Sequence, residues 1–144
     1  MPLRRLTPAF ILLYLLTCHV VPAMVYASDV PDHVVKVFYF HRRFRCPECV
    51  KTEYLVQKAL TKYFSTELKK GEITWQIVDV SVNKNRHYLT DYGFMYNTVM
   101  VVDTRSGEDV RYKNLEGIYD IMEDEEASVE FIRKEVKDYL KPEY

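Results

Sequence analysis

Two cysteines three residues apart, Cys46 and Cys49, are the residues whose type and spacing best fit a chemical role. They enclose a proline and a glutamate in the sequence CPEC, shortly after a run of strand-forming residues. Because proline is well tolerated at the first position of a helix, Pro47 predicts that a helix begins here. A Cys-x-x-Cys pair at a helix start places both sulfurs on the first turn, close enough to form a disulfide. The pair therefore predicts dithiol–disulfide chemistry.

The two thiols are expected to have different roles. Cys46 lies at the helix cap, where unpaired backbone N–H groups and the helix dipole stabilise a thiolate, so it is the predicted nucleophile. Cys49 lies one turn deeper and is expected to be less exposed, which suits it to resolve a mixed disulfide. This exchange needs no organic cofactor. The predicted partner is a protein that carries a thiol or a disulfide.

Charged residues near the pair are expected to modulate it. Four side chains that carry or can gain positive charge precede the first cysteine: His41, Arg42, Arg43 and Arg45. Positive charge lowers the pKa of a nearby thiol, whereas Glu48, between the two sulfurs, acts in the opposite direction. The same basic loop could instead dock an acidic partner surface, or be a solvated loop without a partner.

Three other interpretations of the pair remain open. It could be half of a zinc site with His41 and His87 as nitrogen ligands, but no second Cys-x-x-Cys or His-x-x-x-His completes four ligands, so no metal ligand is predicted. It could be a structural disulfide, although a bridge across so short a loop constrains little chain entropy. It could also be the remnant of a site on a binding module.

The elements that must position the cysteines follow from the hydrophobic pattern. Val34 to Phe40 is a β-branched and aromatic run of strand length. A helix is predicted from Cys46 to about Leu68, ended by Gly71, and Ile73 to Val80 predicts a second strand. The helix is expected to bury one apolar face, made of Val56, Ala59, Leu60, Tyr63 and Phe64.

The second half of the chain adds two helices and two strands. A short helix is predicted over about Asn83 to Tyr92, followed by strands over Val99 to Asp103 and Val110 to Leu115 that form a hairpin. The last helix is predicted over about Glu126 to Leu140. The order βαβαββα predicts an α/β fold, a four-stranded mixed sheet with helices on both faces.

Four residues near the pair are candidates for lining a substrate groove. Phe44 precedes the first cysteine, and Tyr96, Asn97 and Thr98 lead into the third predicted strand. Most of the other tyrosines are expected to be packing residues, because tyrosine suits positions with one apolar and one hydrated end.

Residues 1–27 are expected to be an export signal and not part of the fold. Arg4 and Arg5 form a basic start, an apolar run extends from Leu6 to Val25, and small residues suit cleavage after Ala27. The protein is therefore predicted to be periplasmic or secreted, with residues 28–144 as its one domain. If the segment is retained, it would anchor the protein in a membrane.

Length, composition and net charge limit the classes of function that this protein can have. The chain has 144 residues, 48% of them hydrophobic and 28% charged, which indicates one packed globular domain. A formal net charge of −1 provides no broad basic field, so nucleic acid is not an expected partner. Of the three cysteines, Cys18 lies in the export segment, which leaves one pair in an oxidising compartment. The protein is expected to be a monomer.

With this element order and the CPEC motif after the first strand, the mature chain resembles the thioredoxin-like fold superfamily over nearly its whole length. The segments FYFHRRFRCPECVKTE and YFSTELKKGEITWQIVDV are similar to those of small exported proteins described as nitrophenyl compound nitroreductase subunit ArsF-like. That subgroup name implies an accessory role in a nitroreductase. The resemblance to thioredoxins implies thiol–disulfide exchange at Cys46 and Cys49.

The chain departs from the thioredoxin pattern at two positions. Aligned on Tyr92-Gly93, the cis-proline that precedes the third strand in thioredoxins is replaced by Thr98, whose peptide bond is expected to be trans. The buried acid of thioredoxins, six residues before the first cysteine, is replaced by Phe40. Assistance to Cys49 would then come from elsewhere, for instance His41 or water.

Two hypotheses follow. The first is an exported thioredoxin-like thiol–disulfide oxidoreductase, and the intact dithiol at its helix cap favours it. The second is a non-catalytic accessory or binding subunit whose cysteine pair is structural or binds metal, and the substitutions at Thr98 and Phe40 favour that one.

Overall fold

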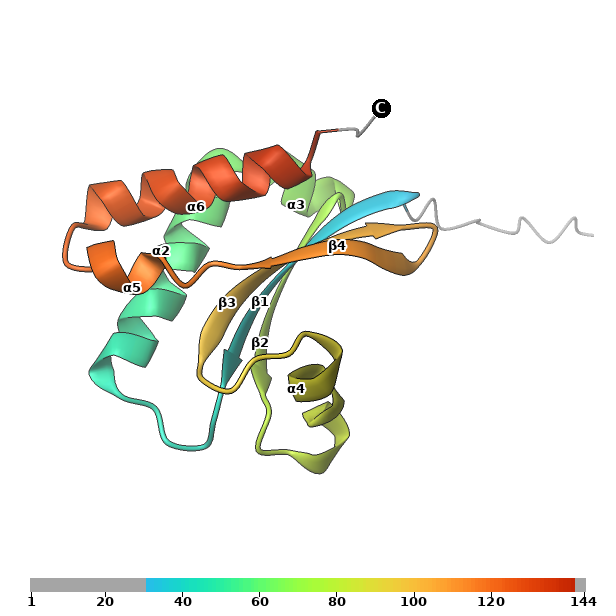
Figure 1. The fold of residues 1–144 in the computed structure, drawn as a ribbon. Helices are drawn as coiled ribbons and strands as arrows, with labels where there is room; N and C mark the ends of the chain where they lie inside the picture. Colours follow the sequence, from blue (N-terminus) through green and yellow to red (C-terminus); the bar gives the residue numbers. More distant parts are fainter. Residues whose placement is uncertain (1–30, 142–144) are drawn as a thin grey trace, which may run out of the picture.

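The computed structural model describes residues 31–141, which form four strands and several helices (Figure 1). The predicted export signal, residues 1–27, lies outside the described residues. In chain order the elements are β1 (His33–His41), α2 (Pro47–Tyr63), α3 (Ser65–Lys70), β2 (Ile73–Asp79), the 3-10 helix η1 (Asn83–Asn85), α4 (His87–Asp91), β3 (Thr98–Arg105), β4 (Glu108–Asn114), α5 (Ile118–Ile121) and α6 (Glu125–Tyr139).

The four strands form one mixed sheet in the order β2-β1-β3-β4. β1 pairs in parallel with β2 and antiparallel with β3, and β4 pairs antiparallel with β3. β1 is therefore an interior strand with both faces covered, which explains its nearly continuous apolar sequence. Side chains of Val37 and Tyr39 join the core on one face, while those of Phe38 and Phe40 join the core on the other.

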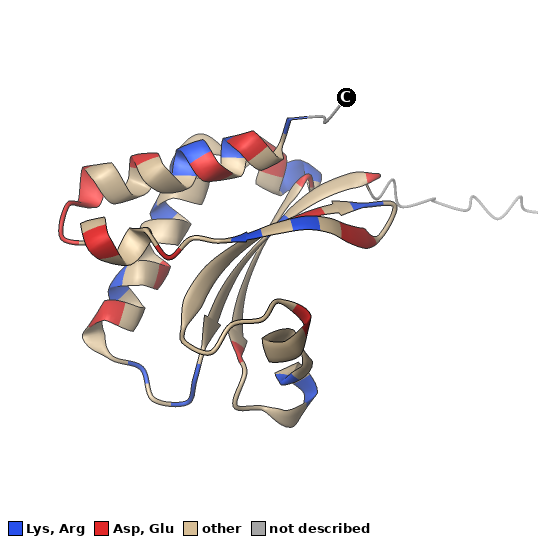
Figure 2. Cartoon of the chain, viewed as in Figure 1, with Lys and Arg blue, Asp and Glu red and all other residues tan. Residues whose placement is uncertain are grey.

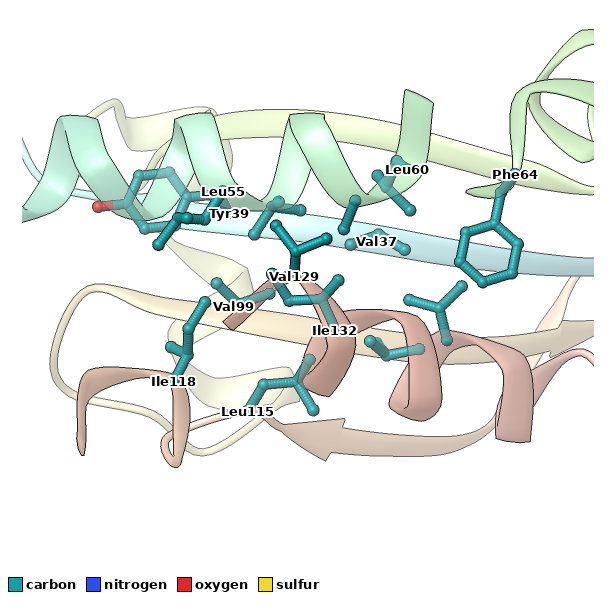
Figure 3. Close-up of a cluster of buried hydrophobic side chains, with 14 of the residues drawn as sticks. Val37, Tyr39, Leu55, Leu60, Phe64, Val99, Leu115, Ile118, Val129 and Ile132 are labelled. Carbon is teal, nitrogen blue, oxygen red and sulfur yellow. The ribbon is translucent and has the colours of Figure 1, made fainter. Parts of the chain in front are cut away.

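One face of the sheet is covered by α2 and α6, which pack against each other as well (Figure 1). Figure 3 shows the side chains between these helices and the sheet, drawn from Val37, Tyr39, Leu55, Leu60, Phe64, Val99, Leu115, Ile118, Val129 and Ile132. Burying one large apolar side chain stabilises a fold by about 1.5–3 kcal/mol relative to leaving it in water. This cluster is the larger of the two cores and anchors the helix that begins at the cysteines.

The other face of the sheet carries an aromatic core beneath η1 and α4. The Phe40 ring stacks on Phe94 with centroids 4.7 Å apart, and Tyr88 and Tyr92 pack around the same ring. Helices thus cover both faces, and the strand order and directions are those of a thioredoxin-like α/β fold. The predicted fold class is confirmed.

The first helix differs from its prediction, because it ends at Tyr63 instead of continuing to Leu68. Phe64 leaves the helical conformation (φ −130°, ψ 27°) while its ring is buried in the first core, and the separate short helix α3 follows. Tertiary packing of this ring therefore overrides the local helical pattern. Tyr63, predicted on the buried face, is 39% exposed. The predicted stop at Gly71 is confirmed, since this residue has the left-handed φ of 75° that glycine tolerates best.

Two other segments differ in detail from the sequence-based expectations. The helix predicted over Asn83 to Tyr92 is divided into η1 and α4, and α5 was not predicted at all. α6 begins one residue earlier than expected, where the Asp124 carboxylate accepts a hydrogen bond from the Ala127 N–H at 3.0 Å. Within residues 31–141 no helix has the length and apolar character to cross a bilayer.

Candidate active site

The cysteine pair lies where the loop after β1 enters α2. Cys46 is the N-cap residue of the helix, with extended backbone angles (φ −81°, ψ 166°), and Pro47 occupies the first turn as expected. The Cys46 carbonyl accepts hydrogen bonds from the backbone N–H groups of Cys49 and Val50, at 3.0 and 3.3 Å. The Cys46 side chain makes no capping hydrogen bond, so its thiol is free to face outward.

The two sulfurs differ in exposure as the sequence predicts. Cys46 is exposed, whereas Cys49 is buried with 4% of its surface accessible. Both are free thiols in this structure, and their Sγ atoms lie 2.7 Å apart. At this separation one thiol proton can be shared between the sulfurs, and a small side-chain rotation brings them to bonding distance.

A hollow of about 520 Å³ opens directly over the pair. Its walls combine the two thiols with aromatic rings and a few polar groups, from Tyr39, Arg42, Phe44, Cys46, Glu48, Cys49, Tyr96, Asn97 and Tyr119. Three of the four groove candidates, Phe44, Tyr96 and Asn97, therefore lie around the cysteines. Thr98 lines a neighbouring hollow of about 450 Å³ that shares Tyr96, Asn97 and Tyr119 with the first.

Exposed apolar side chains lie at the rim of the hollow and next to it. Phe44 is 88% exposed and Tyr96 is 79% exposed, and Met95 beside it is 69% exposed. These are the three most exposed large hydrophobic side chains of the part of the chain that the structure describes. Exposed apolar side chains gathered at one place mark surfaces that contact another molecule.

Asn97 connects three segments at this site. Its Nδ2 donates to the Cys49 Sγ at 3.1 Å, and its Oδ1 accepts from the Arg42 backbone N–H at 3.1 Å. Its backbone carbonyl accepts a hydrogen bond from the Tyr119 hydroxyl at 2.8 Å. The loop after β1, the start of β3 and α5 thus meet at this one residue beside the buried thiol.

Tyr39 lies beneath the buried thiol. Figure 3 shows its ring among the side chains of the first core, with the hydroxyl oxygen at one edge of the cluster. Tyr39 is fully buried, and its hydroxyl makes no hydrogen bond of ordinary geometry to any described residue. The hydroxyl is nevertheless close enough to Cys49 to affect it electrostatically: burial, together with the neighbouring Cys49, raises the pKa of Tyr39.

The two thiols ionise as a coupled pair. The hydrogen bond to Cys49 raises the pKa of Cys46. Burial by itself raises the pKa of Cys49, but donors on Cys46, Tyr39 and Asn97 outweigh burial and lower it overall. The first proton therefore leaves the pair at lower pH than from an isolated buried thiol, and the remaining proton lies between the sulfurs.

The net change in the Cys46 pKa is upward, and its main causes are the hydrogen bond to Cys49 and burial. Figure 2 shows the blue positions along the basic loop between β1 and α2. The Arg42 side chain donates to the Met95 carbonyl at 2.7 Å, and Arg45 forms an ion pair with Glu53. Arg42 thus connects two loops, and Glu53 partly neutralises the charge of Arg45.

His41, Arg43 and Glu48 occupy three different places. His41 Nδ1 lies 2.9 Å from the Arg42 carbonyl, and neither His41 nor Arg43 lines the hollow. The Arg43 backbone N–H donates to the Ser81 hydroxyl at 2.9 Å, toward the end of β2. Glu48 does line the hollow, and its own backbone N–H, assisted by Cys46, lowers the pKa of its carboxyl.

The structure shows where the two residues that depart from the thioredoxin pattern, Thr98 and Phe40, lie. No cis peptide bond occurs in residues 31–141, so the Thr98 peptide is trans as expected, and the Thr98 hydroxyl bonds to Asn114. Phe40 lies in the aromatic core on the far face of the sheet, away from the sulfurs. The β1 residue on the cysteine face is Tyr39, in the same core as Cys49.

Sequence reasoning did not identify Tyr39 and Tyr119 as site residues. The alternation of side chains along β1 places Tyr39 on the same face as Val35 and Val37, so strand periodicity could have identified it. Tyr119 lies in α5, a helix of four residues that no periodic pattern could reveal.

The chemical groups at the site are those of a dithiol with hydrogen-bond donors beside it. Among the described residues, no three His, Cys, Asp or Glu side chains gather closely enough to hold a metal ion. The cysteine pair supplies two sulfur atoms, one of them exposed, next to hydrogen-bond donors that favour a thiolate. This arrangement can form, break and re-form a disulfide.

Comparison with known proteins finds only distant similarity to solved structures. No family model matches the chain, and no curated protein matches it. Solved structures that resemble it include a thioredoxin from Trypanosoma brucei brucei, with 16% identity and a TM-score of 0.41 over 76% of this chain and 80% of that one.

Two further structures resemble it at similar levels. The first two thioredoxin domains of Naumovozyma dairenensis Eps1p share 20% identity with a TM-score of 0.47; the match covers 81% of this chain and 40% of that one. A malarial protein shares 18% identity with a TM-score of 0.38, over 56% of this chain and 80% of that one.

Proposed function

We propose that this protein is an exported thiol–disulfide oxidoreductase with Cys46 as nucleophile and Cys49 as resolving thiol. The observation that carries the proposal is the asymmetry of the pair: an exposed sulfur at a helix cap lies 2.7 Å from a buried one that has its own hydrogen-bond donors. A structural disulfide needs no such difference between its two sulfurs.

The reaction proceeds in two exchanges. The Cys46 thiolate attacks one sulfur of a partner disulfide, a mixed disulfide forms, and the other partner sulfur leaves as a thiolate that takes up a proton. The Cys49 thiolate then attacks the Cys46 sulfur, the Cys46–Cys49 bond forms, and the second partner sulfur leaves. The protein loses two electrons and the partner gains them, and the same steps in reverse oxidise a partner dithiol.

Exposure decides which sulfur attacks first. Because the remaining proton lies between the two sulfurs, either of them can carry the charge of the singly ionised pair. Only Cys46 is open to a macromolecular partner, since Cys49 is 4% exposed. Attack therefore uses the singly ionised form in which Cys46 carries the charge and Cys49 the proton, and the leaving partner thiolate takes up that proton.

The partner is a polypeptide that carries a thiol or a disulfide. Phe44, Met95 and Tyr96 provide an apolar rim on which side chains next to a partner cysteine can pack. We propose that the protein acts as a monomer in the periplasm or outside the cell, after the export signal is removed.

A second candidate is an accessory or binding subunit without catalytic turnover, such as the nitroreductase-associated ArsF-like proteins that the sequence resembles. One observation favours it: the Asn97 carbonyl, beside the position of the missing proline, already accepts the Tyr119 hydroxyl. That hydrogen bond uses one of the two lone pairs of the carbonyl and so competes with pairing to the backbone of a bound polypeptide.

Trapping of mixed disulfides distinguishes the two functions. The Cys49→Ser variant lacks the resolving thiol, so it is expected to accumulate covalent complexes with partner proteins that reductant releases. The matched control, Cys46→Ser, retains only the buried thiol and is expected to trap none. If both variants trap partners equally, or neither does, the oxidoreductase assignment is wrong.

A further inference from the structure

We propose that Asn97 is a positioning residue for the resolving step: its side-chain amide is a fixed hydrogen-bond donor that holds the Cys49 sulfur as a thiolate. This inference rests on the proposed oxidoreductase function for its biological meaning. The hydrogen bond itself can be tested without any assay of turnover.

The orientation of the amide is set by its second hydrogen bond. The Arg42 backbone N–H is a donor only, so the atom of Asn97 that lies 3.1 Å from it must be the acceptor Oδ1. A flipped amide would place its NH₂ group against this N–H and its oxygen against the thiolate, losing both interactions. The NH₂ group therefore faces the Cys49 Sγ, at 3.1 Å.

Two further contacts keep Asn97 in place. The Tyr119 hydroxyl bonds to its backbone carbonyl at 2.8 Å, and the Arg42 guanidinium bonds to the Met95 carbonyl two residues earlier at 2.7 Å. The segment that carries the amide is thus held on both sides. A donor that is held in position before the charge forms costs little reorganisation when the charge appears.

The amide acts differently from an acid–base group. A carboxylate can accept the Cys49 proton and so adds a titration of its own, whereas an amide keeps its protons and stabilises only the anion. In the resolving step the Cys49 thiolate attacks Cys46, the bond from Cys46 to the partner sulfur breaks, and the partner leaves as a thiolate. Asn97 neither gains nor loses a proton, and it raises the fraction of Cys49 that is ionised.

In the Cys46→Ser background, the groups around Cys49 leave its sulfur as the group that titrates in the range where thiols ionise. In the unaltered chain, those that can carry charge near it are Cys46, Glu48, Tyr39, Tyr119 and Arg42. Burial and the nearby sulfurs raise the pKa of Tyr119 to about 12, and burial raises the pKa of Tyr39 as well. Both tyrosines therefore stay protonated in the range where thiols ionise.

The test titrates Cys49 alone, in the Cys46→Ser background, by the ultraviolet absorbance of the thiolate. Adding Asn97→Ala is expected to raise the pKa of Cys49 by about one to two units, the effect of losing a hydrogen bond to a charged group. Asn97→Asp, which retains an acceptor for Arg42 but places a carboxylate next to the sulfur, is expected to raise it further. The matched control is Asn83→Asp, which adds the same charge at an exposed position in η1.

A second readout uses both cysteines. Asn97→Ala is expected to slow release of the partner from a preformed mixed disulfide about tenfold near neutral pH, with rates converging at high pH where Cys49 is ionised in both proteins. Circular dichroism confirms that each variant is folded.

The proposal is overturned if Asn97→Ala and Asn97→Asp leave the pKa of Cys49 the same as in the Cys46→Ser parent, or if Asn83→Asp shifts that pKa equally. If Asn97→Ala raises the pKa of Cys49 as expected but the Cys49→Ser variant traps no partner, the oxidoreductase function is contradicted and this hydrogen bond is not. The two inferences can therefore fail separately.

Discussion

Replacing Tyr39 by phenylalanine separates two effects of its hydroxyl, the cost of burying it and its influence on the ionisation of Cys49. The hydroxyl is fully buried and makes no well-formed hydrogen bond to a described residue, yet it favours the thiolate form of Cys49. Its removal should therefore stabilise the fold when Cys49 is protonated and weaken the ionised form of Cys49.

The size of the first effect follows from the cost of burying an unpaired hydroxyl. A buried polar group without a partner costs about 1–3 kcal/mol. Phenylalanine keeps the ring, which packs among Leu55, Val99 and Ile118 in the first core, so little apolar contact is lost. We expect Tyr39→Phe to raise the free energy of unfolding of the reduced protein by about 1 kcal/mol at pH 6.

The second effect has the opposite sign and appears at higher pH. The folded protein lowers the pKa of Cys49, so its ionisation adds stability that is fully present above the unfolded value of about 8.5 and is lost as pH falls through the folded value. Tyr39→Phe raises the folded pKa toward the unfolded one and removes part of this contribution. The advantage of the variant should therefore shrink between pH 6 and pH 9.

Urea unfolding of both proteins under reductant, at pH 6 and pH 9, measures the two effects together. A variant that is destabilised by 1 kcal/mol or more at pH 6 would show that the Tyr39 hydroxyl has a good partner, and the reasoning would be refuted. A difference between the proteins that does not change with pH would show that this hydroxyl does not act on Cys49.

Three further predictions concern stability, and urea unfolding measures each of them. Ile132→Ala, at a fully buried position between α6 and the sheet, should cost about 3 kcal/mol, and a loss below 1 kcal/mol would contradict the description of this core. Asp124→Ala removes the N-cap of α6 and should cost about 1 kcal/mol, whereas Asp124→Asn should cost much less. Asp103→Asn replaces a fully buried carboxylate, paired with His33 and Arg105, by a neutral amide, so it should lower the free energy of unfolding by about 3 kcal/mol. An unchanged free energy of unfolding would contradict a structural role for this cluster.

The parts of the fold that could be predicted from sequence are those with a strong local pattern. The apolar run from Val34 to Phe40 has one explanation, a strand buried on both faces, and Gly71 ends a helix for a local conformational reason. The CPEC motif placed the sulfurs at the start of a helix, and Cys49 is the buried one. Each of these inferences depends on residues close together in the chain.

The details that sequence did not reveal depend on contacts between distant residues. Phe64 interrupts a helical pattern because its ring is drawn into a core formed by other elements. Asn97 meets Cys49 across 48 positions of the chain, and the spacing of the cysteines carries no information about that contact. Counting residues back from Cys46 puts Phe40 at the position of the thioredoxin acid, whereas strand alternation places its ring on the face of the sheet away from the sulfurs.

The reduction potential of the Cys46–Cys49 pair tests the central claim most directly. The purified protein is equilibrated in buffers that differ in the ratio of reduced to oxidised glutathione. The thiols are then alkylated, and the alkylated fraction is measured by mass spectrometry. We predict a reversible two-electron transition between about −270 and −120 mV, the range of working dithiols of this fold. A disulfide that stays formed below about −300 mV, or thiols that never pair, would contradict it.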